Sequence, residues 1–92
     1  MIRSFKHRGL KRLYEHGDRN RLGSDNIQRI EDIIARLDVS LSPADLDLPG
    51  YALHALKGAL KGFWSVRVSE NWRIIFRFQD GDVFDVNLVD YH

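Results

Sequence analysis

Apolar residues between positions 27 and 37 recur every three or four residues, which is the spacing of one face of a helix. They are Ile27, Ile30, Ile33, Ile34 and Leu37. Ser24, Asp25 or Asn26 stands just before them, and each is of a residue type that caps helix N-termini. This segment is therefore predicted to be an amphipathic helix, the most regularly patterned element of the chain.

A second helix is predicted closer to the N-terminus. Leu10, Leu13 and Tyr14 follow helical spacing from Phe5 onward, and Gly17 is a residue type that ends helices because it tolerates the left-handed conformation. Residues 2–5 precede this helix as a predicted short strand. The two helices together make up the N-terminal part of the fold.

The pattern changes after the helices. Ser42-Pro43-Ala44-Asp45 combines a capping residue, a proline and an acid, as the first turn of a short helix does, and Pro49-Gly50 ends that turn. From Tyr51 onward apolar and polar residues alternate, which predicts β-strands.

A turn at residues 69–71 sets the register of the first predicted hairpin, because only that register puts the apolar residues on one face. The predicted pairs are Val68 with Trp72, Val66 with Ile74, and Trp64 with Phe76. Trp64 and Trp72 are thereby expected in the core. Arg67 then lies opposite Arg73 on the other face, where like charges cost stability unless a carboxylate compensates them.

The second hairpin admits two loops. A two-residue Asp80-Gly81 loop would place Asp85 and Asn87 among core residues, whereas a three-residue loop over 79–81 keeps them out. We therefore predict the longer loop, with Arg73 opposite Asn87 and near Asp85. The predicted apolar pairs are Phe76 with Phe84, Ile74 with Val86, and Trp72 with Leu88.

These elements predict a single α+β domain over residues 1–92. Its two N-terminal helices pack on one face of an antiparallel β-sheet, and the functional site lies on the other, partly polar face. The chain has no cysteine, which fits a reducing compartment, and no apolar run of membrane-spanning length. A cytoplasmic protein without a membrane partner is therefore expected.

The net charge of +1 conceals alternating charged blocks. Residues 1–21 hold seven Lys or Arg against two acids, and residues 51–78 hold five against one. Residues 22–50 and 79–92 are acidic. The basic blocks can attract a polyanion or an acidic protein surface, and the N-terminal one is the candidate RNA-binding or ribosome-binding block. Its candidate residues are Lys6, Arg8, Lys11 and Arg12.

Several residues have the chemistry for metal-free cleavage of RNA, which needs proton carriers and cations near the phosphorus. RNA supplies its own nucleophile, the 2′-hydroxyl. His54 and His92 are candidate proton carriers, and Asp90 can orient a histidine or act as base. The candidate cations are Lys57, Arg67 and Arg73, and Tyr91 can stack on a base or donate a hydrogen bond.

Other chemistries are less favoured. Four scattered histidines without cysteine show no metal-ligand spacing, so no metal and no cofactor is expected. His7 and His16 lie among basic residues on or beside the first helix and are expected to be surface groups. Which group acts as general acid and which as base is left open by the sequence.

Five segments in order resemble one protein family, the HigB toxins of the RelE/ParE superfamily. They are Met1-Ile2-Arg3-Ser4-Phe5, His54-Ala55-Leu56-Lys57-Gly58, Gly62-Phe63-Trp64-Ser65-Val66-Arg67-Val68, Asn71-Trp72-Arg73-Ile74 and Asp90-Tyr91-His92. The resemblance spans essentially the whole chain, although residues 18–49 contribute little to it.

This resemblance implies a RelE-like fold and a type II toxin that enters the ribosomal A site and cleaves mRNA during translation. It also implies a HigA-like helix-turn-helix antitoxin as partner, whose complex with the toxin binds operator DNA. The residues carried over by position are His54, Lys57, Arg73, Asp90, Tyr91 and His92. Two alternatives stay open: a ParE-like gyrase poison that shares the fold without catalysis, and a non-catalytic nucleic-acid-binding module.

Overall fold

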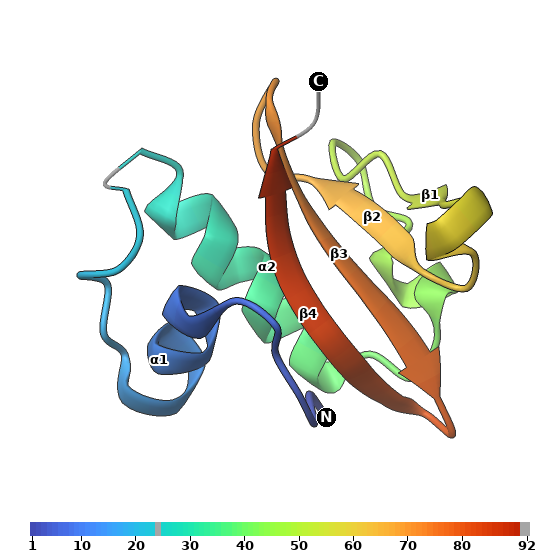
Figure 1. The fold of residues 1–92 in the computed structure, drawn as a ribbon, viewed down its shortest axis with the longest axis horizontal. Coiled ribbons are helices and arrows are strands. Elements are labelled where there is room, and N and C mark those ends of the chain that lie inside the picture. Colours follow the sequence, from blue (N-terminus) through green and yellow to red (C-terminus); the bar gives the residue numbers. More distant parts are fainter. Residues whose placement is uncertain (24, 91–92) are drawn as a thin grey trace.

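The structure is a computed structural model, and it describes residues 1–23 and 25–90. Its helical elements are α1 (Arg8–His16), α2 (Ile27–Val39) and the short 3-10 turns η1 (Pro43–Leu46) and η2 (Gly58–Leu60). Its strands are β1 (His54–Ala55), β2 (Trp64–Arg67), β3 (Trp72–Gln79) and β4 (Asp82–Asp90). The strands form one antiparallel sheet in sequence order, with the helices on one side and β1 at one edge (Figure 1). The predicted α+β fold is confirmed.

Helix α1 begins later than predicted, because the residues before it are bound to the sheet. Ile2 and Phe5 form parallel bridges to Val83 and Val86 of β4, so that the predicted N-terminal strand is present as two isolated bridges. The α1 helix ends as predicted, at Gly17, whose φ of 66° places it in the left-handed region.

Helix α2 carries the predicted apolar stripe. Ile30, Ile33, Ile34 and Leu37 are buried against the sheet, and Ile27 is half-buried beside them. Asn26 precedes the helix with a left-handed φ of 67° and makes no side-chain capping bond. Packing of the stripe therefore outweighs capping as the cause of this helix.

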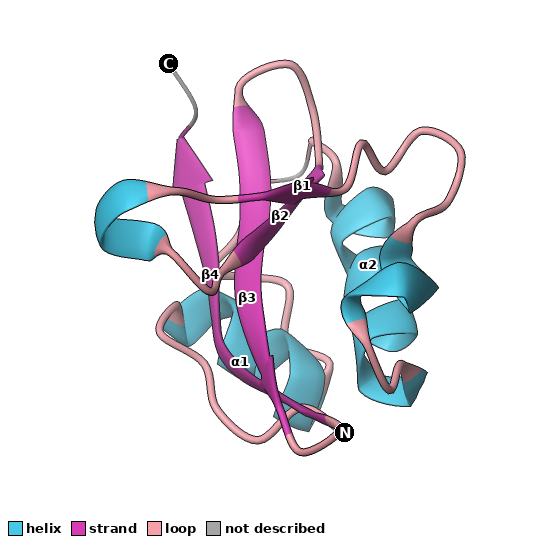
Figure 2. Cartoon of the chain, turned by 90° about the vertical axis from the view of Figure 1, so that its right-hand side faces the viewer, coloured by secondary structure: helices cyan, strands magenta, loops and turns pink. Residues whose placement is uncertain are grey.

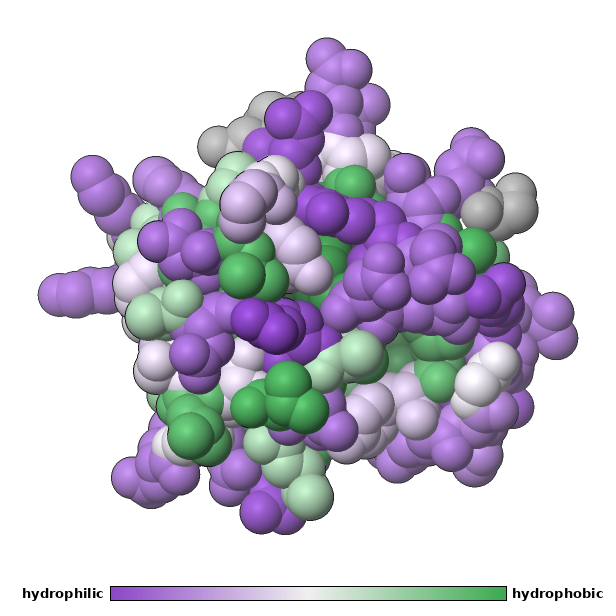
Figure 3. Space-filling view, turned by 180° about the vertical axis from the view of Figure 1, so that it is seen from behind, coloured by the Kyte–Doolittle hydropathy of each residue, from purple (hydrophilic) through white to green (hydrophobic). Residues whose placement is uncertain are grey.

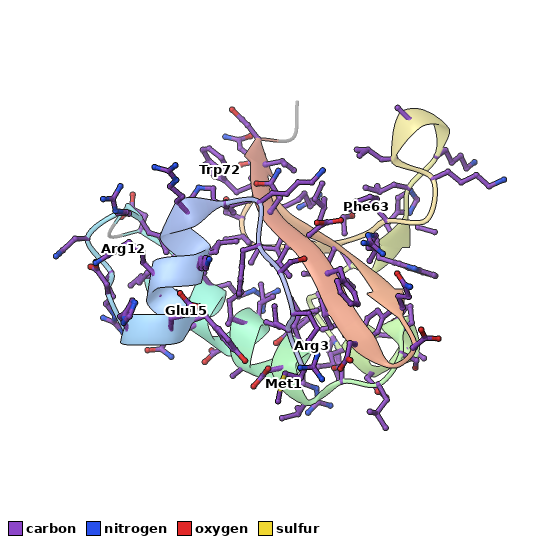
Figure 4. The ribbon with its side chains drawn as sticks, turned by 60° about the horizontal axis from the view of Figure 1, so that its bottom comes forward. Met1, Arg3, Arg12, Glu15, Phe63 and Trp72 are labelled. Carbon is purple, nitrogen blue, oxygen red and sulfur yellow. The ribbon has the colours of Figure 1, made fainter. Side chains whose placement is uncertain are left out.

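The core lies between the two helices and one face of the sheet. Val66, Ile74 and Phe76 from the strands are fully buried there. Trp64 packs against this cluster as predicted, but the prediction for Trp72 is wrong, since its side chain is 41% exposed. Trp72 borders a cavity of about 380 Å³ that is also lined by Ile30 of α2 and by residues of the α1–α2 loop. Figure 4 shows Trp72 on the α1 side of the sheet.

The β2–β3 hairpin has the predicted register. Trp64 lies opposite Phe76, Val66 opposite Ile74, and Arg67 opposite Arg73. The backbone N–H of Val68 donates to the carbonyl of Trp72 at 3.0 Å, which closes the turn as expected. Alternation of apolar and polar residues was sufficient here because neither strand departs from its pleat.

The β3–β4 hairpin does not have the predicted register. Gln79 pairs with Asp82 across the two-residue loop, and the predicted pairing of Phe76 with Phe84 is replaced by Arg77 with Phe84. Both loop residues, Asp80 and Gly81, have positive φ, as the tight turns that suit twisted hairpins require.

A β-bulge explains how the shorter loop still keeps charge out of the core. The register shifts between Ile75 and Arg77, and Asp85 has a left-handed φ of 57°. One additional residue in β4 resets the alternation, so that Val83 and Val86, three positions apart, are both fully buried.

The back of the molecule is mostly hydrophilic, with separate apolar patches (Figure 3). No helix in the described part of the chain is long and apolar enough to cross a membrane.

Candidate functional site

The candidate site lies on the sheet face turned away from the core. Residues directly opposite one another in a ladder share a face, so His54, Ser65 and Ile75 form one row across β1, β2 and β3. Ile75 is buried but is not part of the core cluster, which agrees with its place on this second face. His54, one of the predicted site residues, therefore lies on this second face.

One shallow surface cavity collects the central residues. It has a volume of about 240 Å³ and is lined by Ala52, His54, Ser65 and Arg73. His54 is exposed, Arg73 is half-buried, and Ser65 is only 3% exposed. The structure therefore brings together two predicted site residues, an imidazole and a guanidinium.

His54 is held by a short edge strand. β1 is only two residues long, but the ladder continues through a bond from Leu56 N to Phe63 O at 2.9 Å and one from Arg67 N to Tyr51 O at 2.7 Å. Figure 2 shows β1 in front of the other strands, with α1 behind them. The edge position leaves His54 open to solvent.

Arg29 of α2 fastens the segment that leads into β1. Its guanidinium donates to the carbonyl of Gly50 at 2.7 Å and to that of Arg67 at 3.0 and 3.2 Å, and it lies over the Tyr51 ring at 4.6 Å. Charge-assisted bonds of this kind are stronger than neutral ones. The helix layer thereby fixes the backbone on which His54 is carried.

Ala52, in the wall of the cavity, has a left-handed φ of 49°. This conformation costs a non-glycine residue about 1 kcal/mol or more. Backbone strain beside a candidate site fits a segment whose geometry is imposed by its surroundings.

Arg67 and Arg73 lie opposite each other on this face. Arg73 lies opposite Arg67 on β2 and Val89 on β4, and its guanidinium donates to the carbonyl of Ser69 at 3.2 Å. The prediction that Arg73 lies opposite Asn87 and near Asp85 is wrong, because the bulge shifts the register. Asp85 instead accepts a hydrogen bond from Arg77 at 2.8 Å.

The remaining predicted site residues are not among those that line this cavity. Lys57 is exposed and directly precedes η2, in the connection that follows His54. Asp90 is exposed at the end of β4 and pairs with Trp72, so its ladder row belongs to the α1 side of the sheet. Tyr91 and His92 lie outside the described residues, and their roles stay predictions.

The predicted basic block divides in two. Arg8, Lys11 and Arg12 are exposed on α1, where they border a shallow cavity of about 290 Å³ with Glu15, His16 and Arg21. Arg12 donates to Asp18 at 2.9 Å, and two bonds to the Asp18 carboxylate, from Asn20 N–H and then Arg12, lower its pKa. Lys6 lies apart from the helix, with its ammonium 5.7 Å from the centre of the Phe63 ring.

His7 is not the surface group that was predicted. It is half-buried at the N-terminus of α1, and its Nδ1 accepts a hydrogen bond from the backbone N–H of Leu10 at 3.2 Å. Burial lowers its pKa. His16 is exposed as predicted.

Sequence reasoning missed three residues in or behind the walls of the site: Ala52, Ser65 and Arg29. Ser65 could have been found as the small polar residue between Trp64 and Val66 in a strand. Ala52 and Arg29 carry no local signal, because their roles depend on backbone conformation and on long-range contacts. Within residues 1–23 and 25–90, no group of three His, Cys, Asp or Glu side chains is placed to hold a metal ion.

The architecture is shared with solved structures of bacterial toxins. A structure titled YoeB/ParE toxin from Agrobacterium tumefaciens matches with a TM-score of 0.64 at 18% identity, covering 100% of this chain and 99% of that one. A mutant of YafQ from E. coli matches with a TM-score of 0.63 at 17% identity, covering 98% and 93%. At such low identity these matches define the class of fold, that of the RelE-like toxins.

Sequence comparison gives the family. The model of the HigB-like toxin family, described as the RelE-like toxin of the type II toxin-antitoxin system HigB, matches residues 3–92. A protein of Proteus vulgaris named Endoribonuclease HigB is 42% identical over 92 residues, covering 100% of both chains. Toxin HigB-1 of Vibrio cholerae is 35% identical over 83 residues, covering 88% of this chain and 87% of that one. The chain belongs to the HigB-like family of RelE-like toxins.

Proposed function

We propose that this chain is a toxin that cleaves mRNA on the translating ribosome, without a metal ion, by attack of the RNA 2′-hydroxyl. The observation that carries the proposal is the cavity that His54 shares with Arg73. The proposal is also supported by the name of the Proteus vulgaris relative, an endoribonuclease.

Residues on this face can supply the proton transfers and the positive charge that RNA cleavage needs. The 2′-oxygen bonds to phosphorus as a base takes its proton, and the bond to the 5′-oxygen breaks as an acid protonates that oxygen. An imidazole near neutral pH can serve in either role, and His54 is solvent-accessible enough to reach RNA. Arg73 supplies positive charge to the phosphoryl oxygens, and exposed Lys57 adds a second cation.

The chain's last three residues complete the proposed constellation. Asp90 ends β4, the strand next to the one that carries Arg73, and Tyr91 and His92 follow it in the sequence. His92 is proposed as the second proton carrier, Asp90 as its orienting group and Tyr91 as a stacking surface or hydrogen-bond donor. With two proton carriers the base and acid roles can be divided between two groups.

The ribosome is proposed as an essential partner. The cavity is shallow and has few groups to hold a flexible RNA, so the substrate must be positioned by another body before cleavage is fast. The basic surface of α1, with Arg8, Lys11 and Arg12, is proposed to contact ribosomal RNA.

A reconstituted cleavage assay tests this function. Purified chain is added to a free message and to ribosomes programmed with the same message, and cut sites are mapped. Rapid cleavage only on ribosomes, retained after chelation of divalent ions from the isolated toxin before mixing, is the expected result. Equal rates on free and ribosome-bound message would refute ribosome dependence, and DNA breaks through gyrase with intact mRNA would favour the ParE-like alternative.

The partner that restrains the toxin is proposed to be a HigA-like helix-turn-helix antitoxin, with both proteins in the cytoplasm and their complex on operator DNA. The family is that of a type II toxin, and a YoeB-YefM complex of Staphylococcus aureus is among the structures with this fold. Charge reversal of Arg8, Lys11 and Arg12 together separates two uses of the α1 surface. Loss of ribosome binding with intact antitoxin binding supports ribosomal docking, and the converse supports an acidic antitoxin surface.

A further inference from the structure

Phe63 and Lys6 extend the candidate site beyond the cavity around His54. Phe63 directly precedes β2, and its carbonyl accepts the N–H of Leu56, so the β1–β2 ladder continues to this residue. Because side chains alternate along a strand, Phe63 shares the face of Ser65, two positions further on. Figure 4 shows Phe63 on the β1 side of the sheet, across from Trp72. The ring therefore flanks the row that contains His54.

Lys6 reaches this ring from the opposite edge of the sheet. The N-terminal segment runs beside β4, where the N–H of Lys6 donates to the carbonyl of Val86 at 2.8 Å. The Lys6 ammonium lies 5.7 Å from the centre of the Phe63 ring, within the range of cation–π attraction. An aromatic plane and a positive charge thus adjoin the site although 57 positions separate them in the sequence.

A second cation–aromatic pair on this face, Arg77 with Phe84, differs from the pair of Lys6 and Phe63 in the partners of its charge. The Arg77 guanidinium lies 4.9 Å from the Phe84 ring, but it also donates to Asp85 at 2.8 Å and to Gln79 at 3.0 Å. In the described part of the chain, no carboxylate lies within ion-pair distance of Lys6. The charge of Arg77 is already used within the fold, whereas that of Lys6 is available to an incoming anion.

We propose that Phe63 and Lys6 form a nucleotide subsite for the message, next to the scissile bond. The base of a flanking nucleotide stacks on the Phe63 ring, and its phosphate binds the Lys6 ammonium. An aromatic face accepts any base and an ammonium any phosphate, so the subsite positions RNA without selecting sequence. This inference rests on the proposed ribonuclease function and assigns Phe63 to it.

Single-turnover cleavage on programmed ribosomes tests the subsite with two variants. Phe63→Leu keeps an apolar side chain but removes the aromatic plane, and Lys6→Gln removes the charge. Phe63→Leu is expected to lower kcat/KM by about tenfold, the order of magnitude of one base-stacking contact. Lys6→Gln is expected to lower it by a similar factor through loss of one phosphate contact. Phe63→Tyr retains the plane and is expected to retain the rate. Phe84→Leu is the matched control and is expected to cleave like the parent.

Messages with one ribo-abasic nucleotide on either side of the cut identify the stacked partner. At the correct position the parental rate falls, and Phe63→Leu causes no further loss, because one missing base and one missing ring break the same contact. An undiminished effect of Phe63→Leu on both abasic messages would overturn the proposal and assign the ring to ribosomal RNA.

Cleavage rates report on the subsite and on the proposed function, and thermal melting reports on folding. Equal rates for the parent, Phe63→Leu and Lys6→Gln would refute the subsite while leaving the ribonuclease proposal intact. Absence of cleavage by the parent would refute the proposed function itself. Circular dichroism melting of each variant detects misfolding, and rescue by Phe63→Tyr excludes a general packing defect as the cause of lost rate.

Discussion

The two faces of the sheet are built for different purposes. On the helix side, Val66, Ile74 and Phe76 are fully excluded from solvent. On the other side, Arg67 opposes Arg73 and an open cavity holds His54. Burial of apolar area stabilises the first face, while the second places like charges together at a cost. The contrast predicts that stability and activity can be lost separately.

The largest expected effect belongs to the helix side. Phe76 is fully buried and meets Phe78 edge to face, with ring centres 5.9 Å apart. Phe76→Ala is expected to lower the free energy of unfolding by about 3–5 kcal/mol, through lost burial and the cavity left behind. Urea denaturation measures it. A loss no larger than that of Phe84→Ala, a half-buried residue of the other face, would show that the faces do not differ as described.

His92→Ala is the next largest change and tests the chain end. If His92 transfers a proton, cleavage on ribosomes should slow by roughly 10²- to 10⁴-fold. If His92 serves the chemistry and not the fold, stability should change by less than about 0.5 kcal/mol, the usual range for substitutions that disturb no structural feature. Single-turnover cleavage and thermal melting are measured on the same preparation. Cleavage at the parental rate would exclude proton transfer, and an unfolded variant would assign the C-terminus to structure.

Arg73→Ala is expected to slow cleavage by about 10²- to 10³-fold, the usual loss when one group that stabilises transition-state charge is removed. Its folding stability should change little, because relief of the repulsion with Arg67 is offset by loss of the hydrogen bond to the Ser69 carbonyl. Arg73→Lys is the matched variant, since it keeps the charge and loses the planar fork. A destabilised Arg73→Ala protein would mean that Arg73 serves the fold before it serves chemistry.

The success of sequence reasoning also differed between parts of the sheet. The helices and the β2–β3 hairpin followed from periodicity, because each apolar residue there occupies the place that an undistorted element gives it. The β3–β4 hairpin did not, since Asp85 leaves the regular pleat. The hydroxyl of Ser4 accepts the Asp85 N–H at 2.8 Å and donates to its carboxylate at 3.4 Å. Contacts between residues 81 positions apart have no local signature.

The spacing of Val83 and Val86 contained the missing information. Two strongly apolar residues three positions apart cannot share a face of a regular strand, but they can flank a bulge. The candidate site was predictable in composition, as His54, Arg67 and Arg73 all lie on the second face. Its walls were not, because Ala52 and the clamp from Arg29 depend on a turn-rich segment whose conformation is set by tertiary contacts.

Lowering the pH is expected to reduce the folding stability through His7, the residue that caps α1. Burial lowers the pKa of His7 from its ordinary value of 6.5, so the unfolded chain binds a proton first as the pH falls. Stability should therefore decrease from pH 6.5 downward until the folded-state pKa is passed. A protonated Nδ1 also cannot accept the Leu10 N–H, and loss of a helix cap costs about 1 kcal/mol.

The corresponding variants isolate this group. His7→Asn supplies a non-titrating cap and should flatten the dependence of unfolding free energy on pH between 7 and 5. His16→Asn, which replaces an exposed histidine of the same helix, should leave the dependence as it is in the parent. An unchanged slope in His7→Asn would show that other groups titrate on unfolding.

The smallest expected effect concerns the free energy that is lost by placing Arg67 opposite Arg73 on the second face. Arg67 is exposed and lies opposite Arg73 in the ladder, and the hydrogen bonds from Arg29 go to its backbone carbonyl. Arg67→Gln should therefore raise the free energy of unfolding by up to about 0.5 kcal/mol at low salt, and added salt should remove the gain by screening the repulsion. Lys61→Gln, at an exposed lysine of the η2 connection, should show no such gain.

The same Arg67→Gln protein is expected to bind programmed ribosomes more weakly, with a shallower salt dependence, because it has one cation fewer for phosphate. Higher stability with weaker RNA binding would show that the opposed arginines serve the ligand at the expense of the fold, whereas lower stability would mean that Arg67 is held by interactions that offset its repulsion with Arg73.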